Sequence, residues 1–302
     1  MSFALSLNTG TTPTLNLREA VQLSAEAGLT HIGPWRHLIS DVGGAAEAAK
    51  IITDGGLKAS TLCRGGFLTA NSKQGQAAAL EANREAIREA GIIGADELIM
   101  VVGGLPAAAH VLGGEGERSD KNIASARERV ARTLDDLVPY ALEHGVRLVL
   151  EALHPMYVAD RAVLSTLGQA LDLATPYPTA AVGVVVDTFH VFWDPQLQQQ
   201  IQRAGLENRL ASYQICDFNL PLANDALKSR GMMGDGYVDF ETISRWVSKA
   251  GYRGPVEVEI FNEQINSQPP AQTLATMAER YTELVLPHLN EAAGIVPADV
   301  AL

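Results

Sequence analysis

The sequence has few cysteines, no long apolar run and no basic start. Its two cysteines, Cys63 and Cys216, lie far apart in apolar, strand-like runs, which indicates reduced core thiols in a cytoplasmic protein rather than a disulfide framework. No apolar run approaches the roughly 18 residues of a membrane span, and the N-terminus lacks the basic residues that open a signal peptide. We therefore expect no membrane partner.

Basic residues are also in deficit. The chain has 23 Lys and Arg against 35 Asp and Glu, a formal net charge of −12. A protein that binds the phosphate backbone of nucleic acids needs a basic face, so we expect no nucleic-acid partner. Apolar residues make up 47% of the 302 residues, enough to bury the core of one large α/β unit. This balance favours a protein that acts on a small molecule.

Short β-type runs alternate with longer amphipathic helical patterns along the chain. The expected strands are 3–7, 31–35, 57–63, 97–102, 147–153, 182–187, 210–216 and 255–261. Helical patterns at 16–28, 77–91, 123–145 and 240–251 end in Gly28, Gly91, Gly145 and Gly251, as a helix C-terminus often does. This alternation predicts a parallel sheet, and eight units predict a single-domain (β/α)8 TIM barrel over residues 1–302. An open doubly wound sheet is the alternative, but the loop after the first strand, NTGTTPT, lacks the glycine fingerprint of that fold.

Oxygen-bearing side chains stand at the ends of four consecutive expected strands. They are Glu151, Asp187, Gln214 and Glu259. The carboxyl ends of barrel strands converge on one mouth, so these four side chains should meet there. A single acid at a strand end is more often an ion-pair partner or a helix cap, but a divalent cation is the simplest partner for three clustered carboxylates. Glu257, one layer deeper, is expected to be a buried ion-pair or loop partner and not a ligand.

The segments around these residues resemble the xylose isomerase-like barrel superfamily, and within it the sugar phosphate isomerase/epimerase branch. That branch includes ketose 3-epimerases, inosose dehydratases and isomerases, and 3-dehydroshikimate dehydratases. The matching segments are LEALHP with Glu151, DTFH at 187–190, RGMMGDGYVDF at 230–240 and VEVEIFN with Glu259. The resemblance covers essentially the whole chain. It implies a divalent-metal-dependent isomerase or epimerase that acts on a sugar or keto-polyol.

By this resemblance, one Mn²⁺ or Mg²⁺ ion per chain is held by Glu151, Asp187, Gln214 and Glu259, and His190 and Arg230 bind oxygens of the carbohydrate substrate. The chain departs from the family in two places. Gln214 stands where most members have histidine, and ALHPMY replaces the P-x-N-R-Y-E type of sequence that follows the first metal glutamate of ketose epimerases. An amide oxygen in place of an imidazole favours Mn²⁺ or Mg²⁺ over Zn²⁺.

The expected chemistry is proton transfer at the carbon beside a metal-bound carbonyl, through an enediolate. Glu151 and Glu259, on different sides of the metal, would take and return the proton. His154 is the candidate proton donor, and it opens an alternative in which the same enolisation leads to β-elimination. The protein would then be a lyase, a dehydratase or a C-glycoside deglycosidase that acts on a 3-keto-glycoside with a small partner subunit. The isomerase interpretation is compatible with a homo-oligomer.

Four aromatic residues near strand ends are candidates to contact a sugar ring, with core packing as the alternative: Trp35, Phe67, Tyr157 and Trp193. Two other functional classes compete with a sugar enzyme. The DNA-repair branch of the superfamily needs several more histidines at its zinc site, whereas this chain has seven in all and none at the ends of the third and fourth strands. A barrel without catalytic function would not keep all four ligand-type positions.

Overall fold

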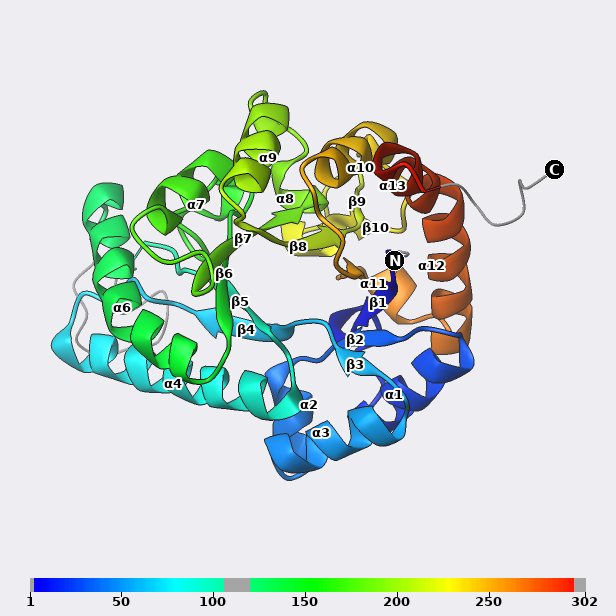
Figure 1. The fold of residues 1–302 in the computed structure, drawn as a ribbon, viewed down its shortest axis with the longest axis horizontal. Helices are drawn as coiled ribbons and strands as arrows, with labels where there is room; N and C mark the ends of the chain where they lie inside the picture. Colours follow the sequence, from blue (N-terminus) through cyan, green and yellow to red (C-terminus); the bar gives the residue numbers. More distant parts are fainter. Residues whose placement is uncertain (1–2, 106–119, 296–302) are drawn as a thin grey trace.

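The main sheet of the protein is a nearly closed barrel of parallel strands. We describe it from a computed structural model, which covers residues 3–105 and 120–295 (Figure 1). Its strand order is β3-β2-β1-β11-β8-β7-β6-β5-β4. The strands are β1 (Leu5–Asn8), β2 (His31–Gly33), β3 (Lys58–Ala59), β4 (Leu62–Gly66), β5 (Glu97–Val101), β6 (Arg147–Glu151), β7 (Val182–Asp187), β8 (Leu210–Ile215) and β11 (Val256–Val258). The predicted (β/α)8 barrel is confirmed.

The third expected strand is broken into two pieces. β3 pairs with β2, and β4 pairs with β5, so the nine strands fill eight barrel positions. A parallel bridge between Trp35 and Cys63 joins the end of β2 to β4, and the Cys63 N–H donates to the Pro34 carbonyl. The expected boundary at residue 63 was therefore too early, because β4 continues through Gly66.

Helices surround the strands on the outside of the barrel (Figure 1). They are α1 (Leu17–Glu26), α2 (Arg36–Asp41), α3 (Ala45–Asp54), α4 (Lys73–Ile93), α6 (Ile123–Glu143), α7 (Leu167–Ala174), α8 (Thr188–Val191), α9 (Leu197–Leu206), α10 (Phe240–Lys249), α11 (Glu263–Asn266), α12 (Pro270–Leu284) and α13 (Leu286–Ala293). Across the described ranges, none of these helices combines the length and apolar composition that a membrane crossing needs.

Glycines end several of the helices, as the sequence predicts. Gly28, Gly145 and Gly251 all have positive φ angles, the conformation that favours glycine after a helix. Gly91 does not end its helix, because α4 runs on to Ile93 and Gly94 takes the left-handed position. A side chain at Gly91 would meet the His144 carbonyl oxygen at 3.1 Å, so this glycine serves the close approach of α4 to the end of α6.

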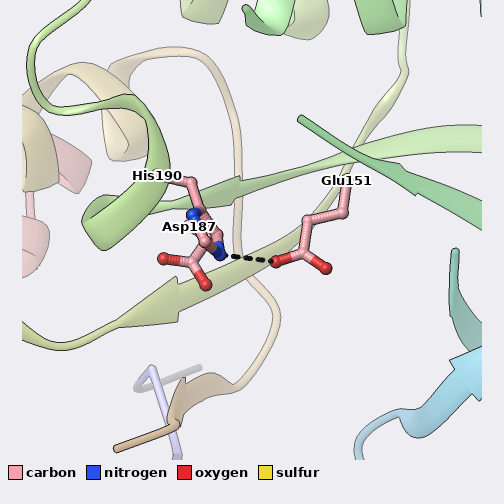
Figure 2. A group of neighbouring side chains, drawn as sticks. All are labelled: Glu151, Asp187 and His190. Atoms are coloured by element: carbon pink, nitrogen blue, oxygen red, sulfur yellow. Dashed lines mark ion pairs between the residues drawn. The ribbon is translucent and has the colours of Figure 1, made fainter. Parts of the chain in front are cut away.

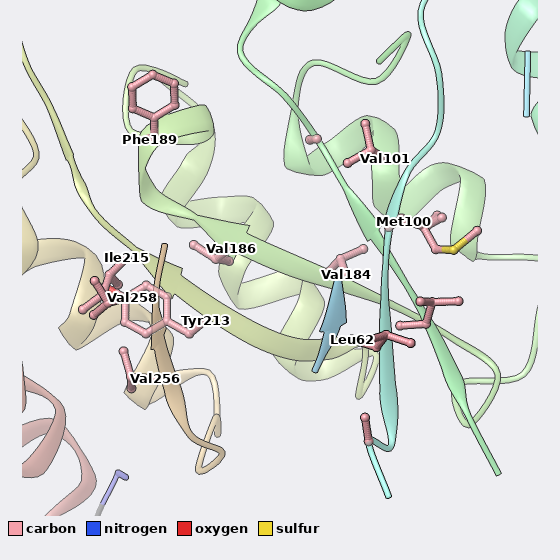
Figure 3. Packing of buried hydrophobic residues seen from close by; sticks show 14 of the residues in the cluster. Leu62, Met100, Val101, Val184, Val186, Phe189, Tyr213, Ile215, Val256 and Val258 are labelled. Atoms are coloured by element: carbon pink, nitrogen blue, oxygen red, sulfur yellow. The ribbon is translucent and has the colours of Figure 1, made fainter. Parts of the chain in front are cut away.

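Side chains alternate between two cores along each strand. Val184 and Val186 of β7 pack outward in the large core between strands and helices, part of which Figure 3 shows. Val185 points the other way and packs inside the barrel with Val149 of β6, among others. Because strand side chains alternate, the residues two positions further on, Glu151 and Asp187, also point into the barrel at its carboxyl-terminal mouth. Cys63 lies in the inner core and Cys216 in the outer one, and both are buried free thiols, as expected.

Candidate active site

Two carboxylates and an imidazole meet at the mouth of the barrel. Glu151 ends β6, Asp187 ends β7, and His190 lies in α8 directly after it (Figure 2). All three are buried, and one possible ligand atom from each lies within 4.8 Å of the others. Burial raises the pKa of Glu151 well above its ordinary value, and the negative charges of Asp187 and Glu259 raise it further. Such a cluster requires positive charge nearby.

Arg230 supplies part of that charge. Its buried guanidinium Nη1 lies 3.1 Å from Asp187 Oδ2 and 3.2 Å from Glu259 Oε2. Burial opposes the charge of Arg230, but Asp187, Cys216 and Glu259 together raise its pKa well above the ordinary value. The pKa of Glu259 is raised to about 7, chiefly by burial and against the attraction of Arg230. One guanidinium among three carboxylates leaves an excess of negative charge.

The glycine-rich motif at 230–240 fixes Arg230 by wrapping around one buried aspartate. Arg230 stands in β10 (Arg230–Gly231), which pairs antiparallel with β9 (Asp217–Phe218). The Asp217 carboxylate accepts the N–H groups of Gly234, Gly236 and Val238 at 2.8 to 2.9 Å. A Cβ atom at Gly236 would lie 2.2 Å from the Phe218 carbonyl oxygen, so the wrapping requires glycine there.

The two ring nitrogens of His190 each face a fixed donor. The His154 N–H lies 3.2 Å from Nδ1, and Arg230 Nη2 lies 3.0 Å from Nε2. Burial lowers the pKa of His190 well below its ordinary value, so the ring is neutral and has only one acceptor nitrogen. In one tautomer Nε2 accepts from Arg230; in the other it carries a proton 3.6 Å from Glu151 Oε1. In both tautomers Nε2 therefore has a protein partner, Arg230 in one and Glu151 in the other.

Gln214 lies beside Asp187 and Glu257 in the strand register. Its Nε2 donates to Glu257 Oε1 at 3.0 Å, while its Oε1 is buried and has no hydrogen-bond partner in the described part of the chain. A carboxylate that is surrounded by donors can only accept, so the amide nitrogen must face Glu257 and the amide oxygen must face away. A buried oxygen without a partner is available to a cation or a substrate group.

Glu257 itself is held by a complete set of donors. Besides Gln214 it accepts from Asn8 Nδ2 at 2.7 Å, from Ser60 Oγ at 2.6 Å and from Thr61 Oγ1 at 2.9 Å. It is buried, as expected, but among the described residues its partners are neutral hydrogen-bond donors and none forms an ion pair with it. Asn8 lies in β1, and Ser60 and Thr61 lie in the break between β3 and β4. The break therefore places two hydroxyl donors against the Glu257 carboxylate.

A cavity opens above these carboxylates. Six of the predicted site residues line it: Trp35, Phe67, Glu151, His190, Arg230 and Glu259. Asp187 and Gln214 are buried next to the lining residues without lining the cavity themselves.

Three other predicted residues pack around His190 and do not line the cavity. The His154 ring stacks on Phe218, with centroids 5.9 Å apart, and meets Trp193 edge-on at 5.7 Å. Trp193 Nε1 donates to the His190 carbonyl at 2.8 Å, and Tyr157 meets the His190 ring edge-on at 5.6 Å. The structure therefore does not bring the predicted proton donor, His154, or the predicted sugar contacts Tyr157 and Trp193 to the cavity.

Sequence reasoning missed three polar or aromatic lining residues, Arg64, Arg161 and Phe261. Arg64 had a visible signal, because a charged residue interrupts the apolar run TLCRGG at a strand end. Phe261 lies two residues after Glu259, at the end of the expected strand 255–261, and meets Trp35 edge-on at 5.7 Å. Arg161 had no signal, since the path of the loop after β6 places it.

Comparison with known proteins identifies the architecture. The family model described as the xylose isomerase-like TIM barrel matches residues 21–283. The chain belongs to this family. The crystal structure of protein SMc04130 from Sinorhizobium meliloti 1021 is 41% identical, covers 93% of this chain and 98% of that chain, and has a TM-score of 0.87.

Two more distant matches carry a named function or ligand. The inosose isomerase of Halalkalibacterium halodurans is 22% identical over 158 residues, so the match spans only about half of either protein, 52% of this chain and 54% of that relative. The IolI protein, solved with a zinc atom, is 17% identical over 96% of this chain and 99% of that chain, with a TM-score of 0.76. At that identity it shows a shared fold.

Proposed function

We propose that the protein is a divalent-metal-dependent isomerase or epimerase of a sugar or keto-polyol. The observation that carries the proposal is the cluster at the barrel mouth: three buried carboxylates and one amide oxygen that has no hydrogen-bond partner among the described residues, beside a cavity that Glu151 and Glu259 line. The distant inosose isomerase supports the same reaction class.

The residues present fit a cation. Glu151, Asp187 and Glu259 supply carboxylate oxygens, and Gln214 supplies an amide oxygen that lacks a hydrogen-bond partner. An all-oxygen set suits Mn²⁺ or Mg²⁺, although a related fold has been solved with zinc. When bound, the ion would polarise a carbonyl oxygen of the substrate.

The protein's own residues would move the proton. Glu151 and Glu259 line the same cavity, and burial raises both pKa values, that of Glu259 to about 7. A carboxylate with a raised pKa is a stronger base, and a value near 7 suits both removal and return of a proton at neutral pH. Arg230 and His190 would hold substrate oxygens, while Trp35 and Phe67 offer apolar surface to a sugar face. The lyase alternative depends on His154, and the position of this residue outside the cavity lining gives it no support.

The test is turnover of ketoses, keto-inositols and 3-keto-glycosides with Mn²⁺ in D₂O. We expect a product of unchanged elemental formula that carries deuterium at the exchanged carbon, and loss of activity after exhaustive chelation. Elimination of water or an aglycone, abolished by His154→Ala while metal binding survives, would show a lyase instead. Full activity after chelation would remove the metal from the mechanism.

A further inference from the structure

The cavity carries two arginines that the proposed chemistry does not use, Arg64 of β4 and Arg161 in the loop after β6. Within the described ranges, Arg64 makes neither a hydrogen bond nor an ion pair. Nε of Arg161 is buried without a hydrogen-bond partner, and its nearest acid is the adjacent Asp160 at 3.4 Å. Arg230, by contrast, is paired on both sides.

Aromatic rings hold the Arg64 guanidinium by its face. Its Cζ lies 4.2 Å from the centroid of Phe67 and 5.8 Å from that of Trp35. Phe67 adopts a φ of 56°, a left-handed conformation that is rare for a bulky residue, and such conformations cluster at ligand sites. A guanidinium stacked in this way keeps its N–H edge for a planar anion.

The charges around the cavity indicate what would occupy it. Three carboxylates, of Glu151, Asp187 and Glu259, stand against three guanidiniums, of Arg64, Arg161 and Arg230. Glu257, one layer deeper, adds a fourth buried carboxylate, and Asp160 is exposed and screened by water. The divalent ion of the proposed function would still leave an excess of about one positive charge over the four buried carboxylates.

Burial makes this excess unfavourable. It lowers the pKa of Arg64, and the nearby charge of Arg161 lowers it further, against the attraction of Glu151 and Glu259. Half-buried cations that no acid meets with a hydrogen bond are costly, and an anion between Arg64 and Arg161 would offset that cost.

We infer that the substrate carries an anionic group, a carboxylate or a phosphate, which Arg64 and Arg161 bind while its carbonyl end lies at Glu151 and Glu259. Both anions present the oxygen pair that an arginine recognises with two hydrogen bonds. This inference rests on the proposed function of the same cavity.

The experiment compares three ligands on the full-length protein loaded with Mn²⁺, by titration calorimetry: a ketohexose, its phosphate ester and a keto-aldonic acid. We expect at least one charged ligand to bind about tenfold or more tightly than the ketohexose, the value of one charge-assisted contact. The ratio of the two affinities should fall toward one in Arg64→Gln and in Arg161→Gln. Arg18→Gln, an exposed site on α1, is the matched control and should leave the ratio unchanged.

Each result decides the question. A preference for the phosphate ester or for the keto acid identifies which anion is bound. If neither charged ligand binds more tightly than the ketohexose, or if the preference persists in both variants, the inference is wrong. Arg64→Lys, which keeps the charge, should retain part of the preference and replaces Arg64→Gln if that variant does not fold. Failure of Mn²⁺ to raise either activity or melting temperature would instead contradict the proposed function.

Discussion

Glu257 and Glu259 are two residues apart at the end of one strand and have opposite environments. Glu257 accepts hydrogen bonds from four side chains at distances of 2.6 to 3.0 Å. Glu259, one layer nearer the mouth, pairs with Arg230 at 3.2 Å, and burial raises its pKa to about 7. The same residue type stabilises the fold where its donors are complete and is reactive where they are not.

The neighbouring strands explain the difference. Asn8 of β1 and the two hydroxyl residues Ser60 and Thr61 supply donors to the lower layer. At the upper layer the surroundings are aromatic, with Trp35 and Phe261 lining the cavity beside Glu259. The lower layer also orients Gln214. Because Glu257 accepts from the Gln214 amide nitrogen, the amide oxygen faces away from Glu257.

The largest effect should follow removal of charge in the upper layer. We expect Glu151→Gln and Glu259→Gln each to lower kcat about a thousandfold or more, the scale of general acid–base catalysis. The melting temperature of the metal-free protein should hold or rise, because a buried and incompletely bonded carboxylate has been removed. Steady-state kinetics and thermal melts measure both, with the exposed Glu241→Gln as control. Near-normal turnover in either variant would contradict the assignment.

The matching change in the lower layer should have the reverse pattern. Glu257→Gln places an NH₂ group against donors and should cost about 1 to 3 kcal/mol in the free energy of unfolding. It also releases the Gln214 amide, so Mn²⁺ affinity should fall about tenfold or more. Urea unfolding without metal and a Mn²⁺ titration test the two effects separately. If the variant is as stable as the native protein, the two layers do not differ as described.

A milder change tests whether Gln214 belongs to the cation site. Gln214→His should keep the fold, since an imidazole N–H can also donate to Glu257. The softer nitrogen ligand should shift the preference among metals toward Co²⁺ or Zn²⁺. Activity after reconstitution of the metal-free protein gives the rank order. An unchanged order would place Gln214 outside the metal's ligands.

The barrel could be predicted, and so could the position of Glu151, Asp187 and Glu259 at its mouth, because both follow from short-range patterns. Strand–helix alternation set the fold, and two-residue periodicity placed Glu151 and Asp187 inside the mouth. The R-G-x-x-G-x-G pattern also indicated that Arg230 is a functional residue, although its contacts were not predictable.

Three features could not be predicted, because they depend on tertiary packing. The His154 ring stacks on Phe218, which lies more than 60 residues away in sequence. The proximity of His154 to Glu151 along the chain therefore did not indicate where its ring lies. Gly91 was predicted to end a helix, because the sequence around it does not indicate its close contact with the end of α6. Arg161 reaches the cavity only through the path of its loop.

The smallest expected effect concerns a third glutamate, Glu97, at the opposite end of the barrel. It is the first residue of β5 and is half-buried, and burial raises its pKa from 4.5 to about 8 against the attraction of Arg147. In this pH window the folded protein retains a proton that the unfolded chain has lost. The contribution of Glu97 to stability is therefore fully present below the unfolded pKa and is lost as pH rises through the folded value.

Between about pH 5 and pH 8 we expect a loss of about 1 kcal/mol in the free energy of unfolding, because water screens a half-buried group. Glu97→Gln should remove that part of the pH dependence, whereas the exposed Glu283→Gln on α12 should not. Urea unfolding of the metal-free proteins at the two pH values measures it. If the free energy of unfolding depends on pH equally in Glu97→Gln and in the native protein, the raised pKa of Glu97 does not affect stability. Effects of unpaired carboxylates would then be limited to the mouth of the barrel.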